Sequence, residues 1–216
     1  MDIPPDEKLK KFFAGSKPIY YKKGEIVLRI GETRSGAFYV KNGFLKDSSM
    51  STDGREFILF IFKPGDLFSY SWIFNKTPNE HSFKAMTDCV VYEKTRESLL
   101  LFLEQNPDVQ FMISQNIVIR MRGLMKRMEY LAFGTANQKV SAMFALLAER
   151  FGKSTDKGIT IPIYLTQQDI AELIGISRET TSIEIKKLLD LGVITRASSN
   201  YTIVHIEKLN KSALIG

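Results

Sequence analysis

The stretch that decides the fold is LTQQDIAELIGISRETTSIEIKKLLDL, residues 165–191. Thr166 can cap a first helix, Gly175 can form a tight turn, and Ser177 can cap a second helix. Two short helices joined in this way predict a helix-turn-helix. Apolar residues at helical spacing give each helix a buried face, namely Ile170, Ala171, Leu173 and Ile174 in the first and Ile185, Leu188 and Leu189 in the second. Two helices joined by glycine can also serve only as packing elements. The flanking sequence is therefore needed to distinguish this alternative from a DNA-binding motif.

The second helix of this motif carries the candidate base-reading residues, because its first residues enter the DNA major groove. Arg178 suits the two acceptors of guanine, and Glu179 can accept a hydrogen bond from the cytosine amino group. Hydroxyl, amide and ammonium groups near the helix starts can hold phosphates. The predicted DNA contacts are Thr166, Gln167, Gln168, Ser177, Arg178, Glu179, Thr180, Ser182, Ile183, Lys186 and Lys187.

The flanking segments favour a winged helix-turn-helix. After the motif, residues 193–206 (VITRASSNYTIVHI) predict a β-hairpin wing. Before it, Thr135 can cap a helix that runs through Phe151. Residues 152–158 are then expected to form a polar loop, and residues 159–165 (ITIPIYL) a short strand. This combination favours DNA binding over plain packing.

A long helix is expected from Pro107 to about Phe133, since Asn106 can cap it and Asp108 places an acid in its first turn. Its apolar residues repeat at heptad spacing, as in one strand of a coiled coil. We therefore predict a dimer interface followed by a hinge at Gly134. The predicted interface residues are Phe111, Ser114, Ile117, Val118, Met121, Leu124, Met125 and Met128. The alternative is that this seam packs on the chain's own N-terminal domain.

The N-terminal half has a different texture. Residues 17–94 alternate short runs of Ile, Val, Phe and Tyr with glycine turns, which predicts an antiparallel β-roll or barrel. Asp53-Gly54 between two such runs is a strong hairpin signal. Helices are expected at residues 6–14 and from Thr95 onward. The predicted fold class is α+β, with a jelly-roll-like β-roll sensor domain at 1–105, a dimerisation helix and hinge at 106–134, and a winged helix-turn-helix DNA-binding domain at 135–216.

Composition limits the function classes. The 216 residues carry a net charge of +6, which suits a polyanionic partner without proving one. Cys89 is the single cysteine and His81 and His205 are the two histidines, so clusters of these residues that bind zinc or iron–sulfur centres are excluded. We recognise no membrane-spanning run, signal peptide, nucleophile–base pair or Walker-type loop. We therefore expect a cytoplasmic protein that is not an enzyme and has no membrane partner.

The sequence resembles the CRP/FNR superfamily of bacterial regulators over nearly its whole length. The D-I-A-x-x-I-G-x-S-R-E-T run at residues 169–180 looks like the family signature, supported by KKGEIVLRIGE (22–32), FYVKNGFLK (38–46) and DGREFILFIFKPGDLF (53–68). The resemblance implies a homodimer on palindromic double-stranded DNA, with Arg178 and Glu179 reading bases. It also implies contact with RNA polymerase, which some relatives make through a loop at the place of residues 152–158.

The reading helix departs from the family at one position. The family often has R-E-T-V-S-R, whereas this chain has R-E-T-T-S-I, with Ile183 in place of the second arginine. Isoleucine cannot donate a hydrogen bond to guanine, so we expect an altered preference at one base step. The double substitution Thr181→Val with Ile183→Arg should shift the selected sites toward the family's common pattern.

The sensor region departs more seriously. Members that bind cyclic AMP carry a phosphate cassette that starts G-E and later supplies an arginine and a serine; here Gly65-Asp66 keeps the start, but TPNEHSFKA (77–85) holds no arginine. Glu80 would repel a phosphate, and Lys84 could compensate only if it points inward. A cyclic nucleotide is therefore not expected. An iron–sulfur cluster is excluded by the cysteine count, and a haem held by His81 is not expected either.

Aromatic and methionine side chains around this cassette suggest a pocket for a small organic effector with one polar handle. The predicted effector contacts are Phe62, Phe68, Tyr70, Trp72, Phe83, Lys84, Met121 and Met125. The alternative is that these side chains fill the core of the roll and that the protein is constitutively active. We thus expect a homodimeric DNA-binding transcription regulator, controlled by a small molecule other than cyclic AMP or by none. The rival from another class is a module whose winged helix docks a protein.

Overall fold

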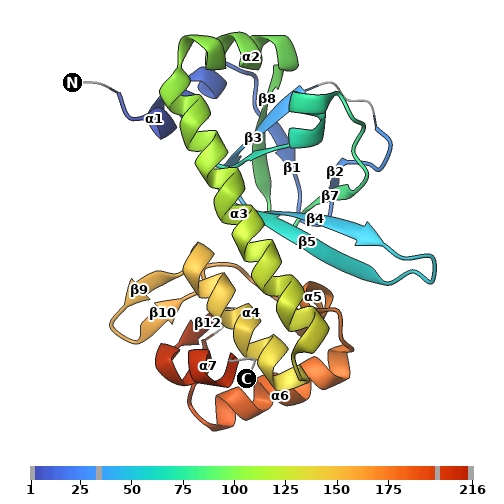
Figure 1. The fold of residues 1–216 in the computed structure, drawn as a ribbon, viewed down its shortest axis with the longest axis vertical. Coiled ribbons are helices and arrows are strands. Elements are labelled where there is room, and N and C mark those ends of the chain that lie inside the picture. The colour runs from blue at the N-terminus through green and yellow to red at the C-terminus, as the bar shows by residue number, and fades with distance from the viewer. Residues whose placement is uncertain (1–2, 33–35, 198–199, 214–216) are drawn as a thin grey trace. The chain divides into compact units, whose positions relative to one another are not determined.

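The computed structural model describes residues 3–32, 36–197 and 200–213 and divides into two compact units, Met1–Val118 and Ile119–Gly216. The first unit holds α1, α2, β1–β8 and the first part of α3, and the second holds the rest of α3, α4–α7 and β9–β12 (Figure 1). No helix in the described part of the chain combines the length and apolar character that crossing a membrane requires.

Antiparallel strands form the predicted β-roll. One four-stranded sheet has the order β1-β8-β3-β6, and the other has the order β2-β7-β4-β5. The strands are β1 (Ile19–Tyr21), β2 (Ile26–Leu28), β3 (Gly36–Asn42), β4 (Leu45–Met50), β5 (Glu56–Phe62), β6 (Leu67–Phe68), β7 (Ser82–Ala85) and β8 (Cys89–Thr95). The predicted α+β fold class and the strand-turn texture of this region are confirmed.

Two glycine turns fix where the chain reverses. β4 and β5 form the hairpin that Asp53-Gly54 predicted, and Gly54 adopts φ 82°, a left-handed conformation that glycine adopts easily. Gly43, which precedes β4, has φ 83°, and a Cβ atom there would collide with the carbonyl oxygen of Asp88. Only glycine therefore fits where the chain enters β4.

Helices α1 (Pro5–Ala14), α2 (Arg96–Gln105) and the start of α3 (Pro107–Phe133) lie at one end of the roll (Figure 1). Phe12 of α1 stacks on Phe102 of α2 with ring centroids 4.3 Å apart. Their apolar faces close one core cluster against the roll, made of Leu9, Phe13, Ala37, Tyr39, Leu67, Ile73, Tyr92, Leu99, Leu103, Val109 and Ile113. The helices that were expected at residues 6–14, from Thr95 and from Pro107 to Phe133 are confirmed.

The second unit is a winged helix-turn-helix, as predicted. Its helices are α4 (Ala136–Phe151), α5 (Gln167–Ile174), α6 (Arg178–Asp190) and α7 (Ile206–Ala213). Its strands are β9 (Lys153–Thr155), β10 (Gly158–Thr160), β11 (Ile194–Ala197) and β12 (Asn200–Ile203), in the order β11-β12-β10-β9. Thr135 caps α4 through a reciprocal pair of hydrogen bonds with Gln138, of 3.3 Å and 2.8 Å.

Three local predictions in this unit are wrong. The polar loop expected at 152–158 is instead β9 and the turn into β10, which pair as a hairpin. All three residues of β9 are exposed, so polar side chains are compatible with a strand here. The strand expected at 159–165 ends at Thr160, since the nearby Pro162 has no N–H to donate to a neighbouring strand.

The third correction concerns the end of the wing. The hairpin expected at 193–206 ends at Ile203, and Ile206 begins α7, a helix that the sequence analysis did not predict. Leu209 and Ala213 are the buried residues of α7, and their spacing is helical. Ser198 and Ser199, within the predicted hairpin, lie outside the described residues.

Candidate nucleic-acid interface and sensor core

The helix-turn-helix is held by hydrogen bonds at its two helix starts. Thr166 Oγ1 accepts from the backbone N–H of Asp169 at 3.0 Å, and Asp169 Oδ2 accepts from the backbone N–H of Thr166 at 2.8 Å. Gly175 ends α5 in a left-handed conformation with φ 64°. Ser177 Oγ then accepts from the backbone N–H of Thr180 at 3.1 Å, which begins α6. These are the caps and the turn that the sequence predicted.

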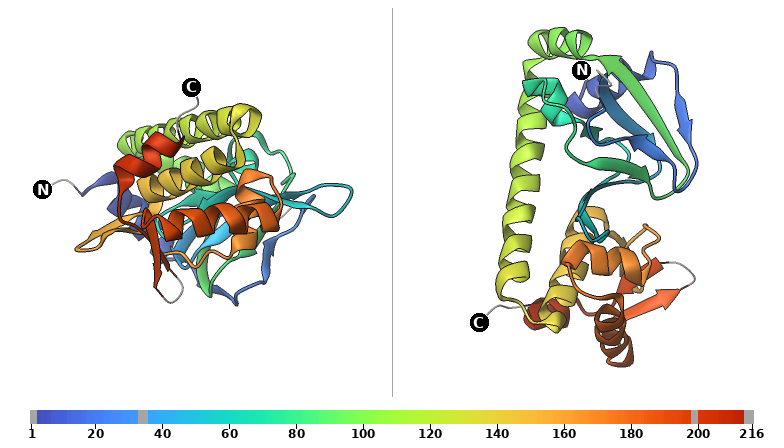
Figure 2. Two further views of the ribbon diagram at one scale, coloured as in Figure 1. Left: turned by 90° about the horizontal axis from the view of Figure 1, so that it is seen from below. Right: turned by 90° about the vertical axis from the view of Figure 1, so that its right-hand side faces the viewer.

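The predicted DNA contacts lie where DNA can reach them. The start of α6 lies at the surface of the unit (Figure 2). Exposed residues of the predicted set are Gln168, Ser177, Arg178, Glu179, Ile183, Lys186 and Lys187, and half-buried ones are Thr166, Gln167, Thr180 and Ser182. The hydroxyls of Ser177 and Thr180 are also bonded to each other, at 2.9 Å. Apart from Ile183 the side chains of this set are polar or charged, and most of them lie at the starts of α5 and α6.

The opposite face of α6 is anchored in the unit. Ile185 and Leu188 are buried as predicted, and Leu189 is half-buried. Thr181 is fully buried, and its Oγ1 donates to the carbonyl oxygen of Ser177 at 2.9 Å. Thr181 therefore lies away from the reading face, and the substitution Thr181→Val would not alter what that face presents to DNA.

Sequence reasoning missed a polar tie between α6 and α4. The carboxylate of Glu184 accepts from Asn137 Nδ2 at 2.9 Å and from Lys187 Nζ at 2.7 Å. Burial raises the pKa of Glu184, but these two partners outweigh it, so the pKa lies below its usual value. Asn137 is in the first turn of α4, so this bond fixes the middle of α6 to the start of α4. The sequence did contain a signal for this contact, because Glu184 is a charged residue at a position on the apolar face that anchors α6.

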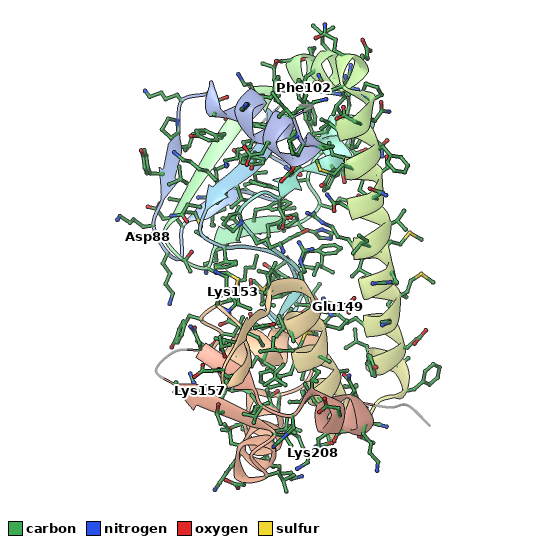
Figure 3. All side chains as sticks on the ribbon, turned by 90° about the vertical axis from the view of Figure 1, so that its left-hand side faces the viewer. Asp88, Phe102, Glu149, Lys153, Lys157 and Lys208 are labelled. Atoms are coloured by element: carbon green, nitrogen blue, oxygen red, sulfur yellow. The ribbon has the colours of Figure 1, made fainter. Side chains whose placement is uncertain are left out.

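Basic side chains also extend beyond the motif. Arg196 of the wing lies over the ring of Tyr201, with its guanidinium carbon 5.0 Å from the ring centre. Lys153 and Lys157 on the β9–β10 hairpin and Lys208 on α7 are exposed (Figure 3). None of these four was among the predicted contacts, because each stands alone in the sequence rather than in a motif.

The heptad seam of α3 is an exposed apolar face. Within the first unit Val109 and Ile113 pack into the core, whereas Phe111 and Val118 are 65% and 66% exposed. Phe111 and Val118, seam residues of the first unit, therefore do not pack on the chain's own roll, contrary to the alternative. Of the predicted interface, Phe111, Ser114, Ile117, Val118, Met121, Met125 and Met128 are exposed and Leu124 is half-buried.

The predicted effector contacts divide into separate groups. Phe62, Phe68 and Phe83 are buried in the interior of the roll, with ring centroids 5.2–5.8 Å apart. They fill a core cluster whose other members are Val27, Leu28, Phe38, Val40, Leu45, Ala85, Cys89 and Val91, which agrees with the core-filling alternative. Tyr70 and Trp72 lie at a π-helical turn, η1 (Ser71–Asn75), and are half-buried.

Lys84 does not face the interior of the roll. Phe83 and Ala85, its neighbours on β7, both belong to the interior cluster, and successive side chains of a strand point to opposite faces. The assignment of Lys84 to the effector pocket is therefore wrong, since its ammonium group points away from that interior. Met121 and Met125 are exposed residues of α3 in the second unit.

The interior of the roll instead holds an acid. Asp47 of β4 stands opposite Phe60 and Phe83 in the strand register, and its side chain is only 10% exposed. His81 Nδ1 lies 3.6 Å from Asp47 Oδ1, and that oxygen accepts no hydrogen bond in the described structure. Burial raises the pKa of Asp47 to about 7. In the described part of the chain, no group of three or more acids, histidines or cysteines could hold a metal ion.

Comparison with known proteins follows the same division of the chain. Residues 18–106 match the family model of the cyclic nucleotide-binding domain, and residues 133–212 match that of the Crp-like helix-turn-helix domain. The "CRP-like cAMP-activated global transcriptional regulator" of Mycobacterium tuberculosis is 26% identical over 197 residues, which cover 91% of this chain and 88% of that protein. The chain belongs to the CRP/FNR family of transcription regulators. Members of this family bind DNA and regulate transcription, and they are not enzymes.

Solved structures of the CRP/FNR family share the fold of this member. FixK2 from Bradyrhizobium japonicum matches with a TM-score of 0.79 at 19% identity, over 93% of this chain and 98% of that one. A variant of CooA from Carboxydothermus hydrogenoformans matches with a TM-score of 0.80 at 18% identity, over 99% and 97% of the two chains. The β-roll and winged helix-turn-helix architecture is therefore that of known regulators.

Proposed function

We propose that this CRP/FNR-family regulator acts as a homodimer that reads palindromic DNA with the starts of its two α6 helices. The observation that carries this proposal is the exposed start of α6, where Arg178 and Glu179 present a guanine-reading and a cytosine-reading side chain. The hydroxyl and amide groups around them would hold the phosphates that set the register. In a two-fold dimer the two half-sites should lie about one helical turn apart.

The dimer would form through α3. A face that carries Val118, Met125 and Met128, each more than half exposed, is costly to leave in water. Burying it against the same face of a second copy gives a self-complementary, two-fold contact. The heptad spacing of these residues suits two helices that wind around each other.

The effector of this chain would not be a cyclic nucleotide, although the curated relatives carry the name cAMP-activated. Two observations oppose a phosphate in this roll: no arginine in residues 77–85, and the exposed carboxylate of Glu80. Lys84, the candidate compensating cation, points away from the interior. We therefore propose that the effector is a small organic molecule, or that the protein has none. We also propose that the protein holds neither an iron–sulfur cluster nor a haem. Contact with RNA polymerase is proposed from family resemblance alone.

The decisive experiment is selection of DNA fragments from a random pool by the purified protein at moderate salt. An enriched palindrome supports the proposal, and Arg178→Ala should weaken the enrichment and relax the preference at the base pair that Arg178 contacts. Lys208→Ala on α7 serves as an exposed control. If enrichment requires added cell extract, an effector controls binding. Affinity without base preference or salt dependence would favour the protein-docking alternative.

A separate titration tests the effector assignment. Calorimetry of the dialysed protein with cyclic AMP should show no binding, and cyclic AMP should leave the affinity for the selected site unchanged. Tight binding of cyclic AMP would overturn the assignment, while leaving the DNA-binding proposal intact.

A further inference from the structure

An isoleucine lies on the exposed side of α6, which is the side proposed to read DNA. Ile183 is 56% exposed, four residues after Glu179 and three before Lys186, and both of these are exposed as well. Residues three and four apart lie side by side on one face of a helix. The anchoring face of α6 is a different one, where Thr181 and Ile185 are buried. Ile183 therefore belongs to the surface that meets the major groove, not to the core.

The chemistry of isoleucine restricts what it can recognise in that groove. Its side chain neither donates nor accepts a hydrogen bond, so it cannot pair with the polar edges of guanine, cytosine or adenine. The only apolar group that a base pair displays in the major groove is the C5-methyl group of thymine. An apolar side chain at this place gains from a methyl group and loses from a polar base edge that it deprives of water.

We propose that Ile183 reads the C5-methyl group of a thymine in each half-site. The inference rests on the proposed DNA reading by α6 and specifies one position of the site. Cβ atoms four residues apart on a helix lie about 5–6 Å apart, and bases of one strand rise about 3.4 Å per step. The thymine should therefore lie one or two base pairs from the pair that Glu179 contacts. Ile183 gives this regulator a methyl-dependent base step, where a second arginine would have given a guanine step.

The test removes the methyl group and nothing else. The palindrome selected by the wild-type protein has equivalent thymines in its two half-sites. At each such position in turn, both thymidines are replaced by deoxyuridine. At one position uracil should weaken binding by about fourfold for each half-site, or about 15-fold for both, which corresponds to losing one buried methyl group. Ile183→Ala should bind the thymine and uracil sites equally. The exposed Leu191, at the end of α6, provides a matched aliphatic control, and Leu191→Ala should keep the discrimination.

Two further measurements sharpen the result. A cytosine at the identified position should weaken binding, and 5-methylcytosine should restore part of the loss, because it returns the methyl group. Selection with Ile183→Arg alone should replace the thymine by guanine, since Thr181 lies in the core and does not have to change. Thermal unfolding checks that the exposed substitutions leave the fold intact.

The proposal fails if uracil is tolerated at every position, or if Ile183→Ala keeps the same uracil penalty as the wild type. Both outcomes leave an enriched palindrome and so spare the proposed function. Absence of any enriched sequence, with or without cell extract, overturns both proposals together.

Discussion

The helix-turn-helix motif and strand β4 of the roll place their polar residues in opposite ways. In the motif, most polar residues lie at the surface or cap a helix, and the buried Thr181 and Glu184 each have hydrogen-bond partners. In the β-roll, three consecutive polar residues of β4, Lys46, Asp47 and Ser48, are buried. Lys46 is paired with Glu56 at 2.9 Å, whereas Oδ1 of Asp47 accepts no hydrogen bond from the residues that the structure describes.

This difference teaches that the reading motif and β4 are under different constraints. The polar groups of a surface that reads DNA are solvated by water in the folded protein. Keeping them there therefore lowers the free energy of unfolding very little. A carboxyl group among phenylalanine rings costs free energy that an apolar residue would not. Such a cost is typical of a site kept for a purpose other than stability.

The largest expected effect tests that cost. In Asp47→Asn the side chain keeps its shape and loses the ionisable group. Because the folded-state pKa of Asp47 is raised to about 7, the folded protein holds more protons than the unfolded chain between pH ~4 and ~7, and its stability falls as the pH rises through this window. The variant should therefore be more stable than the wild type by about 1–4 kcal/mol at pH 8, with the difference shrinking toward pH 4.

Thermal unfolding across this pH range measures the difference. Asp156→Asn, at an exposed turn, is the matched control and should follow the wild-type curve. An Asp47→Asn protein that is no more stable at pH 8 would mean that the roll accommodates its acid without cost, and the comparison between the motif and β4 would break down.

The next effect concerns the exposed surface. Arg178→Ala should cost about 1–3 kcal/mol of specific DNA binding, through the lost contact to guanine. Because the side chain is exposed, the melting temperature should stay within error of the wild type. Fluorescence anisotropy on the selected site and on a scrambled site separates specific from general loss. A large fall in the melting temperature would show that Arg178 also stabilises the fold.

A smaller effect is expected at the helix cap. Thr166→Val removes the hydroxyl that accepts from the backbone N–H of Asp169, and it should destabilise the protein by about 0.5–2 kcal/mol. Thr195→Val, on the exposed strand β11, is the control, because valine suits a strand. Equal melting temperatures for the two variants would show that the cap contributes nothing measurable.

The smallest effect is electrostatic. Lys186→Ala should weaken binding equally on the selected and scrambled sites and lower the salt dependence by about one phosphate contact. Measurement of affinity at several salt concentrations gives the slope. If only the selected site were affected, Lys186 would belong among the base-reading residues instead.

The helix-turn-helix and the long helix could be predicted in detail because local signals specify them. Thr166, Gly175 and Ser177 act through bonds to residues a few positions away, which a sequence pattern records. The β9–β10 hairpin and α7 escaped prediction because their stability depends on pairing and packing with distant segments. Burial on both faces of β4 is likewise a tertiary property.

The candidate site shows the same limit. The exposed position of Arg178 follows from the motif alone, whereas the inward position of Asp47 required the register of β4 against β5 and β7. Lys84 was assigned to the wrong face of β7. Side chains alternate between the two faces of a strand, and the sequence does not show which residues of β7 pair with those of β4.

The bond between Glu184 and Asn137 has a consequence for control. Because it fixes the middle of the reading helix to the first turn of α4, the two helices should turn together when the backbone near Gly134 moves. Arg178, Glu179 and Ile183 would then keep their mutual positions in every regulatory state. If an effector controls this regulator as proposed, α6 would move as a whole with α4, so DNA affinity would change and the bases that these three residues read would stay the same.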